Sequence, residues 1–103
     1  MIFVKRYDTD HGVLIAMCDE ELIGRVLKEG KIEMDLEKYA SFYRGELMSE
    51  ADAGKMEISE LYSANIVGER AVSIMMKKGI VCKDEVKKLG KVPFVQVYRL
   101  DSI

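Results

Sequence analysis

Several residue types that build catalytic and metal sites are scarce in this sequence of 103 residues. It has one histidine, His11, two cysteines, Cys18 and Cys82, and no tryptophan. Because a structural zinc site takes four nitrogen or sulfur ligands at short spacings, these three residues do not supply one. Cys18 follows the apolar residues 13–17, so we expect a buried thiol rather than a nucleophile. We therefore predict neither a metal nor another cofactor.

The sequence also lacks a long apolar segment. No run approaches the roughly 20 residues that cross a membrane as a helix. The first residues form a strand-like pattern rather than the charged and then apolar layout of a signal peptide. Proline occurs once and no linker-like segment is present, so we expect a single domain over residues 1–103, in the cytoplasm and without a membrane partner.

Charge is distributed unevenly along the chain. Residues 1–50 carry 7 basic and 11 acidic side chains, a net charge of −4, whereas residues 51–103 carry 9 and 7, a net charge of +2. Most of the positive charge lies in residues 77–91, where six lysines meet two acids. Such a tract is able to contact phosphate, although solvated lysines at a helix end have the same composition.

Four segments have the composition of β-strands. A cluster of turn residues, 8–12, separates the first two and favours a β-hairpin, whose second strand is apolar enough for burial on both faces. The third alternates apolar with charged residues, which places Ile32, Met34 and Leu36 on an inward face. The expected strands cover residues 2–7, 13–17, 31–36 and 94–100.

Helix signals lie between these strands. Asp19 is placed to cap a short helix, and Ser49 with Asp52 resembles a capping box that opens a helix ending near residue 57. A long helix is expected over residues 59–78, closed by Gly79. The sequence thus predicts an α+β domain, with a mainly antiparallel sheet of about four strands and one long helix and shorter helices packed on one face.

One glycine lies inside the expected long helix. Gly68 would cost such a helix about 1 kcal/mol relative to alanine, so we expect another group to approach its backbone. Asn65, Glu69 and Arg70 are the polar residues beside it. Together with Asp19, which follows the second strand, they form the candidate polar site.

Three segments resemble a known family. They are residues 18–24 (CDEELIG) with Glu29 and Gly30, residues 64–72 (ANIVGERAV) and residues 92–99 (VPFVQVYR). In this order they look like the archaeal domain-of-unknown-function family 424. The resemblance implies a small cytosolic archaeal protein of unassigned activity, supplies no catalytic residues, and argues against a well-known enzyme class.

Three functions are compatible with these features. The first is a non-enzymatic module that binds RNA or a ribonucleoprotein, in which Tyr43 or Tyr98 stacks on a base. Its candidate phosphate contacts are Arg70, Lys77, Lys78, Lys87, Lys88 and Arg99.

The second is an enzyme or anionic-ligand site, with Glu69 as acid or base and Asn65 and Arg70 orienting the substrate. The third is a protein-interaction or homo-oligomeric module that uses methionines and an exposed Ile66. A structural role for the candidate site, in which its side chains pair with buried backbone groups, is the alternative to all three.

Overall fold

In the computed structural model, which describes residues 1–98, a six-stranded sheet forms the centre of the protein. Its strand order is β5-β1-β2-β6-β8-β7, and every neighbouring pair is antiparallel except β2 and β6. The strands are β1 (Ile2–Thr9), β2 (Gly12–Asp19), β5 (Glu46–Met48), β6 (Leu61–Val67), β7 (Lys87–Leu89) and β8 (Val92–Tyr98). The predicted mainly antiparallel α+β architecture is confirmed, but the sheet has six strands rather than four.

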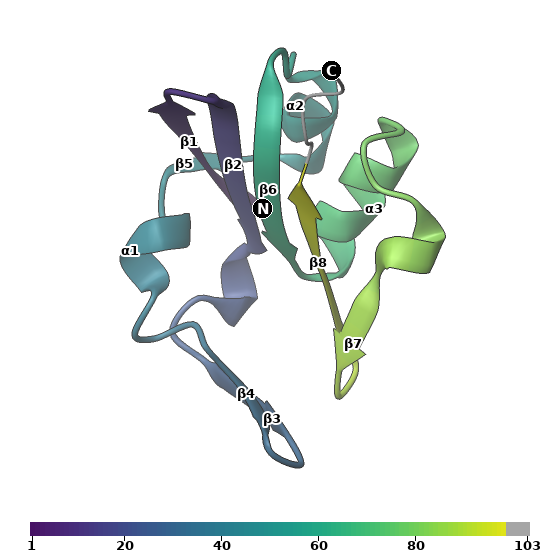
Figure 1. Ribbon diagram of the computed structural model, residues 1–103. Coiled ribbons are helices and arrows are strands. Elements are labelled where there is room, and N and C mark those ends of the chain that lie inside the picture. The colour runs from purple at the N-terminus through teal and green to yellow at the C-terminus, as the bar shows by residue number, and fades with distance from the viewer. Residues whose placement is uncertain (99–103) are drawn as a thin grey trace.

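A second, two-stranded sheet extends away from this body as a hairpin (Figure 1). It consists of β3 (Val26–Glu29) and β4 (Ile32–Asp35). Leu36, just after it, is buried and Met34 is half-buried, as predicted, whereas Ile32 is 63% exposed. Ile32 lines a cavity on the same side of the hairpin as Met34, but it lies near the hairpin tip and is not covered, so the prediction is right for its direction and wrong for its burial.

Helices lie on both faces of the six-stranded sheet. The helix-covered face packs against α2 (Glu50–Lys55) and α3 (Glu69–Lys77) through one apolar cluster. The opposite face, which we call the hairpin face, packs against α1 (Ala40–Tyr43), the short helix η1 (Glu20–Leu22) and the β3–β4 hairpin. A further short helix, η2 (Lys83–Glu85), precedes β7. The prediction that all helices pack on one face is therefore wrong for α1.

The long helix predicted over residues 59–78 is a strand followed by a helix. Residues Leu61–Val67 form β6 in the middle of the sheet, and the helix begins only at Glu69. Pairing with β2 on one side and β8 on the other gives this apolar segment partners on both edges, and tertiary context of this kind overrides local helix preference.

Two local end signals, at Ser49 and Gly79, were predicted correctly. Ser49 Oγ accepts a hydrogen bond from the Asp52 amide at 3.1 Å, which caps α2. Gly79 follows α3 with a φ of 75°. Its amide donates to Met76 O and the Ile80 amide donates to Met75 O, the bond pattern of a Schellman motif. Within residues 1–98, no helix is long and apolar enough to cross a membrane.

Candidate functional site

The best-defined polar contacts lie where β2 and β6 end side by side. Because these two strands are parallel, Asp19 at the end of β2 meets the residues that open α3. Its carboxylate accepts hydrogen bonds from the Arg70 amide at 3.1 Å and the Ala71 amide at 2.9 Å. Asp19 therefore caps α3, more than 50 positions along the chain, rather than the short helix η1, for which it was predicted.

Gly68 is the residue that makes this contact sterically feasible. Its φ is 112°, a conformation that side chains disfavour, and a Cβ atom there would lie 2.3 Å from Asp19 Cγ. The predicted close approach to the Gly68 backbone is confirmed. Its setting differs, since Gly68 lies between a strand and a helix rather than inside a helix.

Arg70 is surrounded by acids. Its Nη1 lies 2.6 and 2.7 Å from the two carboxylate oxygens of Glu21 and 3.8 Å from Asp19 Oδ2, and its Nε lies 3.8 Å from Glu50 Oε1. The hydrogen bond from Arg70 lowers the pKa of Glu21, whereas burial raises the pKa of Asp19 despite its two amide donors. The guanidinium is thus engaged with carboxylates of its own chain.

The predicted polar cluster of Asn65, Glu69 and Arg70 is not brought together. Asn65 lies on β6, where its Oδ1 accepts a hydrogen bond from Gln96 Nε2 at 2.9 Å. Glu69 is exposed at the first position of α3. Of the four candidate residues, only Asp19 and Arg70 are in contact.

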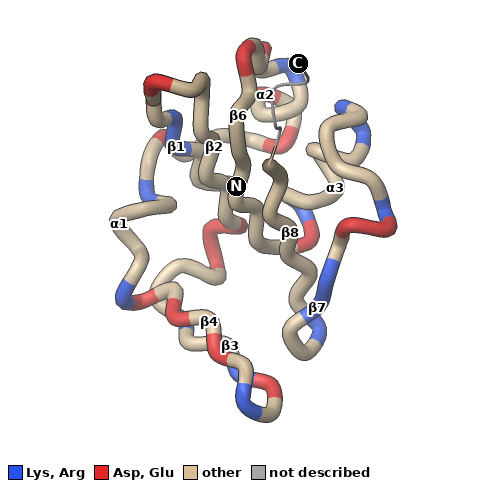
Figure 2. The backbone as a smooth tube through the Cα atoms, in the orientation of Figure 1, with Lys and Arg blue, Asp and Glu red and all other residues tan. Residues whose placement is uncertain are grey.

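The predicted phosphate contacts also lie in separate places. Figure 2 shows the basic segments at the end of α3 and along β7 well apart. Lys77 is exposed at the end of α3, and Lys78 Nζ donates to Met56 O. Lys87 and Lys88 are exposed on the edge strand β7. Arg99 lies outside the described residues.

The hairpin face holds two adjoining cavities of about 220 and 290 Å³. Asn65 lines both, as do Met34 and Tyr43, so the two lie side by side, and together we call them the hairpin-face cleft. One wall comes from the β3–β4 hairpin and α1, and the other from β7 and β8. The remaining lining residues are Ile32, Glu33, Asp35, Leu36, Tyr39, Phe42, Ile66, Val67, Leu89, Phe94, Val95 and Gln96.

One contact joins the two walls of the cleft, and others hold α1 against β1. The Glu29 carboxylate, at the end of β3, accepts a hydrogen bond at 2.6 Å from the Gly90 amide in the turn between β7 and β8. On the other side, Tyr7 stacks on Phe42 with ring centroids 5.3 Å apart, and the Tyr7 hydroxyl donates to Phe42 O at 2.8 Å. The cleft is consequently a preformed feature of the fold.

Aromatic side chains on this face differ in exposure. Tyr98 is 68% exposed, whereas Tyr43 is only 9% exposed and burial raises its pKa to about 12. Of the two tyrosines predicted to stack on a base, only Tyr98 is therefore accessible. Gln96 was missed at the sequence level, although the alternation of buried Val95 and Val97 with outward Gln96 and Tyr98 carries the signal.

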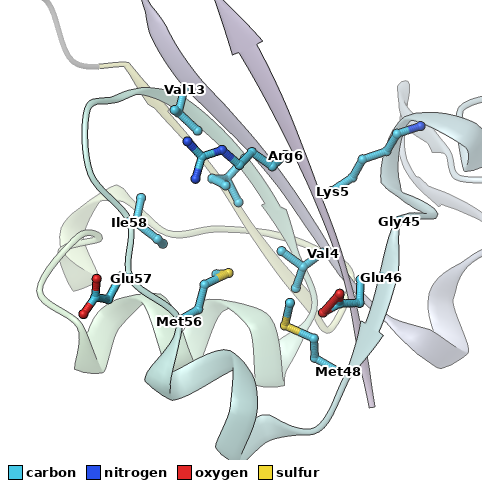
Figure 3. Close-up of a pocket in the computed structure, with 11 residues that line it drawn as sticks. Val4, Lys5, Arg6, Val13, Gly45, Glu46, Met48, Met56, Glu57 and Ile58 are labelled. Atoms are coloured by element: carbon cyan, nitrogen blue, oxygen red, sulfur yellow. The ribbon is translucent and has the colours of Figure 1, made fainter.

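A third cavity, of about 370 Å³, lies on the helix-covered face beside β1. Figure 3 shows Val4, Met48, Met56 and Ile58 around a common apolar space. Charges of both signs lie at its margin, with Arg6 from β1 and Glu46 and Glu57 from the segments beside it, whereas the Lys5 side chain points away from the cavity (Figure 3) and donates to Ser41 O.

Cys18 is buried, and burial raises the pKa of its thiol to about 12, so it is protonated at neutral pH. Cys82 is exposed. Among residues 1–98, no three His, Cys, Asp or Glu side chains are grouped so as to hold a metal ion.

Comparison with known proteins places these features in a family. The chain is similar to a solved structure, the crystal structure of an uncharacterized conserved protein from Methanopyrus kandleri, with 28% sequence identity and a TM-score of 0.77. That similarity covers 99% of this chain and 96% of the other. The comparison with curated proteins found no match. A family model described as "Protein of unknown function (DUF424)" matches residues 7–100, and the chain belongs to that family.

Proposed function

We propose that this protein is a non-enzymatic binding module whose hairpin face binds single-stranded RNA. The observation that carries the proposal is the exposed Tyr98 ring on β8, two positions beyond Gln96 and on the same face of the strand as Phe94 and Gln96, which line the cleft. An aromatic ring on an open sheet face provides a surface on which an unpaired base stacks.

Lysines near this face supply the charge that the RNA backbone needs. Lys87 is paired with Phe94 in the sheet, which places it on the hairpin face, and Lys91 lies in the turn that follows β7. Lys77 lies on the other side of the sheet, at the end of α3. Arg70, which is paired with Glu21, is not needed for this mode of binding.

The test is fluorescence polarisation of a labelled single-stranded RNA of about 10 nucleotides, measured at low and at high salt. We expect binding at low salt that weakens steeply as salt is added, because lysine–phosphate contacts release counterions. Tyr98→Ala should weaken binding about tenfold, the typical effect of losing one stacked base.

Two lysine variants form a matched pair. Lys87→Gln should weaken binding, whereas Lys77→Gln should leave it unchanged, because both side chains are exposed but only Lys87 lies on the hairpin face. Equal effects of the two substitutions would point to non-specific charge attraction. Absence of binding at low salt would contradict the proposal.

The enzyme alternative depended on Glu69 acting beside Asn65 and Arg70. Asn65, on β6, is hydrogen-bonded to Gln96 on β8, whereas Glu69 is exposed at the start of α3, so no contact between Asn65 and Glu69 supports that alternative within residues 1–98.

The third predicted function, a protein-interaction or homo-oligomeric module, would use another surface than the one expected. Ile66 is fully buried, so the expected exposed patch around it is wrong. The edge of β1 offers another surface. Pairing with β5 covers only Ile2–Val4, and no strand within residues 1–98 pairs with Lys5–Thr9 on that side.

A second copy of the chain is the partner that this edge fits best. An unpaired strand edge is a template for pairing, and the cavity beside it carries both signs of charge, as a self-complementary two-fold interface requires. Sedimentation velocity at increasing protein concentration tests this second candidate. We expect a dimer that is lost in Arg6→Glu, which reverses an exposed charge on the free edge beside the cavity, and retained in Leu47→Glu; a monomer at every concentration would exclude it.

A further inference from the structure

We propose that the tips of two hairpins act together to bind phosphates of the RNA backbone. One tip is the turn between β3 and β4, which carries Lys31, and the other is the turn between β7 and β8, which carries Lys91. We call these two turns the lysine fork. The inference rests on the proposed RNA-binding function and adds to it a second hairpin and a fixed phosphate-binding geometry.

The two tips have the same sequence pattern and the same kind of turn. Residues 28–32 read KEGKI and residues 88–92 read KLGKV, so a glycine–lysine pair follows a lysine and precedes a β-branched residue in both. In each hairpin this glycine–lysine pair is the two-residue loop between the last paired residues of the strands. Gly30 and Gly90 have φ values of 60° and 65°, as a tight hairpin turn with glycine first requires. Each tip therefore presents one exposed lysine beyond the end of its strands.

A hydrogen bond joins the two tips, although its partners are 61 positions apart in the sequence. The Glu29 carboxylate accepts this bond from the Gly90 amide at 2.6 Å. Figure 1 shows both hairpins extending from the same end of the molecule. Lys31 and Lys91 lie within two residues of the joining bond, each on its own loop. The bond thus holds the two loops, and with them the two lysines, in a fixed relation.

Positive charge is concentrated at the joined tips. Residues 28–33 and 87–92 carry five lysines and two glutamates, a net charge of +3, in a chain whose net charge is −2. Lys28 pairs with Glu33 at 3.8 Å, on the side of the β3–β4 hairpin that faces away from the cleft. Within residues 1–98, neither lysine of the fork forms an ion pair. Like charges that are held near one another repel, and an anionic ligand removes that repulsion.

The fork lies at the end of β8 opposite Tyr98. Ile32 and Leu89, which adjoin the two loops, both line the hairpin-face cleft. Gln96 lines the same cavity farther along β8, and Tyr98 follows two positions later. At a rise of about 3.4 Å per residue, β8 spans roughly 20 Å from Val92 to Tyr98. One RNA strand that runs along β8 therefore meets the stacking ring at one end and the fork at the other.

The experiment measures how the affinity for RNA depends on salt. The whole protein is titrated into a labelled uridine strand of about 10 nucleotides, and binding is followed by fluorescence polarisation at several salt concentrations. The slope of log affinity against log salt has a magnitude of about 0.7 for each phosphate contact to a single strand. Lys31→Gln and Lys91→Gln should each reduce this magnitude by about 0.7. Lys55→Gln is the matched control and should leave it unchanged, because Lys55 is an exposed lysine at the end of α2, on the helix-covered face.

A second set of variants tests whether the two tips act as one unit. Glu29→Ala removes the acceptor of the Gly90 amide and so separates the tips. In that background, Lys31→Gln should change the slope much less than it does in the wild type, because Lys31 is no longer held beside the other loop. Comparing one substitution in two backgrounds cancels the general effect of deleting the Glu29 charge. An equal effect of Lys31→Gln in both backgrounds would overturn the fork.

The outcomes separate this inference from the function on which it rests. Tyr98→Ala should weaken binding but keep the slope, since it removes a stacked base and no phosphate contact. Absence of RNA binding at low salt would overturn both the function and the fork. Binding with a slope that Lys31→Gln does not change would overturn the fork alone, and so would an equal loss of slope in Lys55→Gln.

Discussion

The two faces of the central sheet are covered to different extents. The helix-covered face is closed by α2 and α3, and its strand residues Ile66, Met17 and Val95 are at most 2% exposed. The hairpin face is closed only where η1, α1 and β3–β4 reach it, and around Asn65 and Gln96 it stays open. Both faces bury an apolar cluster, but only the hairpin face leaves part of its strands, around Asn65 and Gln96, uncovered by other elements. Substitutions on the two sides should therefore separate stability from binding.

The largest loss of stability is expected at the junction that holds α3 against its face. Gly68→Ala would place a Cβ 2.3 Å from Asp19 Cγ at a φ of 112°, and overpacking plus backbone strain should cost about 4 kcal/mol. Gly54→Ala is the matched control. Gly54 lies inside α2 with no atom within 4 Å of an added Cβ, so this change should stabilise by about 0.5–1 kcal/mol. Urea unfolding measures both, and equal effects would contradict the close contact at Gly68.

Two neighbours on β6 give the most direct comparison of the faces. Ile66 is fully buried against the helices, so Ile66→Ala should lower the free energy of unfolding by about 3 kcal/mol. Asn65→Ala, one position away on the open face, should cost less than about 1 kcal/mol, since it removes one exposed amide–amide bond. A large loss for Asn65→Ala would show that the amide pair is structural. Chemical denaturation of the two variants, side by side, decides this.

A smaller loss is expected when the cap of α3 is removed. Asp19→Ala leaves the Arg70 and Ala71 amides without their acceptor and should destabilise by about 2 kcal/mol. Asp52→Ala serves as the control. Asp52 has an exposed side chain in the first turn of α2, and its backbone amide keeps its bond to Ser49, so the cost should be a few tenths of a kcal/mol. Thermal and urea unfolding of the two variants would show whether the long-range cap matters more than the local charge.

The acid range adds a test of sign. Burial raises the pKa of Asp19 above 3.8 in the native state, so the native protein binds this proton more tightly than the unfolded chain. Its contribution therefore makes stability fall as pH rises from 3.8 through the raised pKa. Glu21 acts in the opposite direction, because its lowered pKa gives stability that is lost as pH falls below 4.5. The free energy of unfolding is measured against pH for the wild type and for Asp19→Asn, and the difference between the two curves isolates the contribution of Asp19. A difference, wild type minus variant, that rises with pH would contradict the raised pKa.

The smallest effect on stability is expected at Tyr98. Its side chain is 68% exposed and touches Tyr62 only edge to face, at 6.5 Å between ring centroids, so Tyr98→Ala should change stability by no more than about 0.5 kcal/mol. The same substitution should reduce RNA binding. Melting temperature and binding measured on one sample would distinguish a surface residue used for recognition from one used for folding.

Local chemistry explains which parts of the fold were predictable. Three element boundaries were predicted because they depend on hydrogen bonds between residues a few positions apart. They are the turn before Gly12, the start of α2 at Ser49 and the end of α3 at Gly79. The strands β3, β5 and β7 were missed because three or four residues carry no periodic pattern and become strands only through the backbone of a partner. Residues 61–67 were assigned to a helix because apolar and small residues in a short run have no decisive period.

The same limit explains the candidate site. Gly68 and Asp19 were identified as important, but their contact depends on β2 and β6 being parallel neighbours, which no local pattern reveals. Asn65 was identified, but its partner Gln96 was not, because the pairing of β6 with β8 defines that contact. The sequence was sufficient to identify single candidate residues. Which of them lie in contact depends on the order and direction of the strands.

The bond between Asp19 and α3 also has a consequence for the rate of folding. The hairpin of β1 and β2 closes over a few residues, but the Asp19–Ala71 contact joins positions 52 apart and requires the parallel pairing of β2 with β6 first. Contacts between distant residues carry the chain-closure entropy and slow the search for the native state. We expect this corner to form late, after the N-terminal hairpin, so that its loss in a variant such as Asp19→Ala would speed unfolding far more than it slows folding.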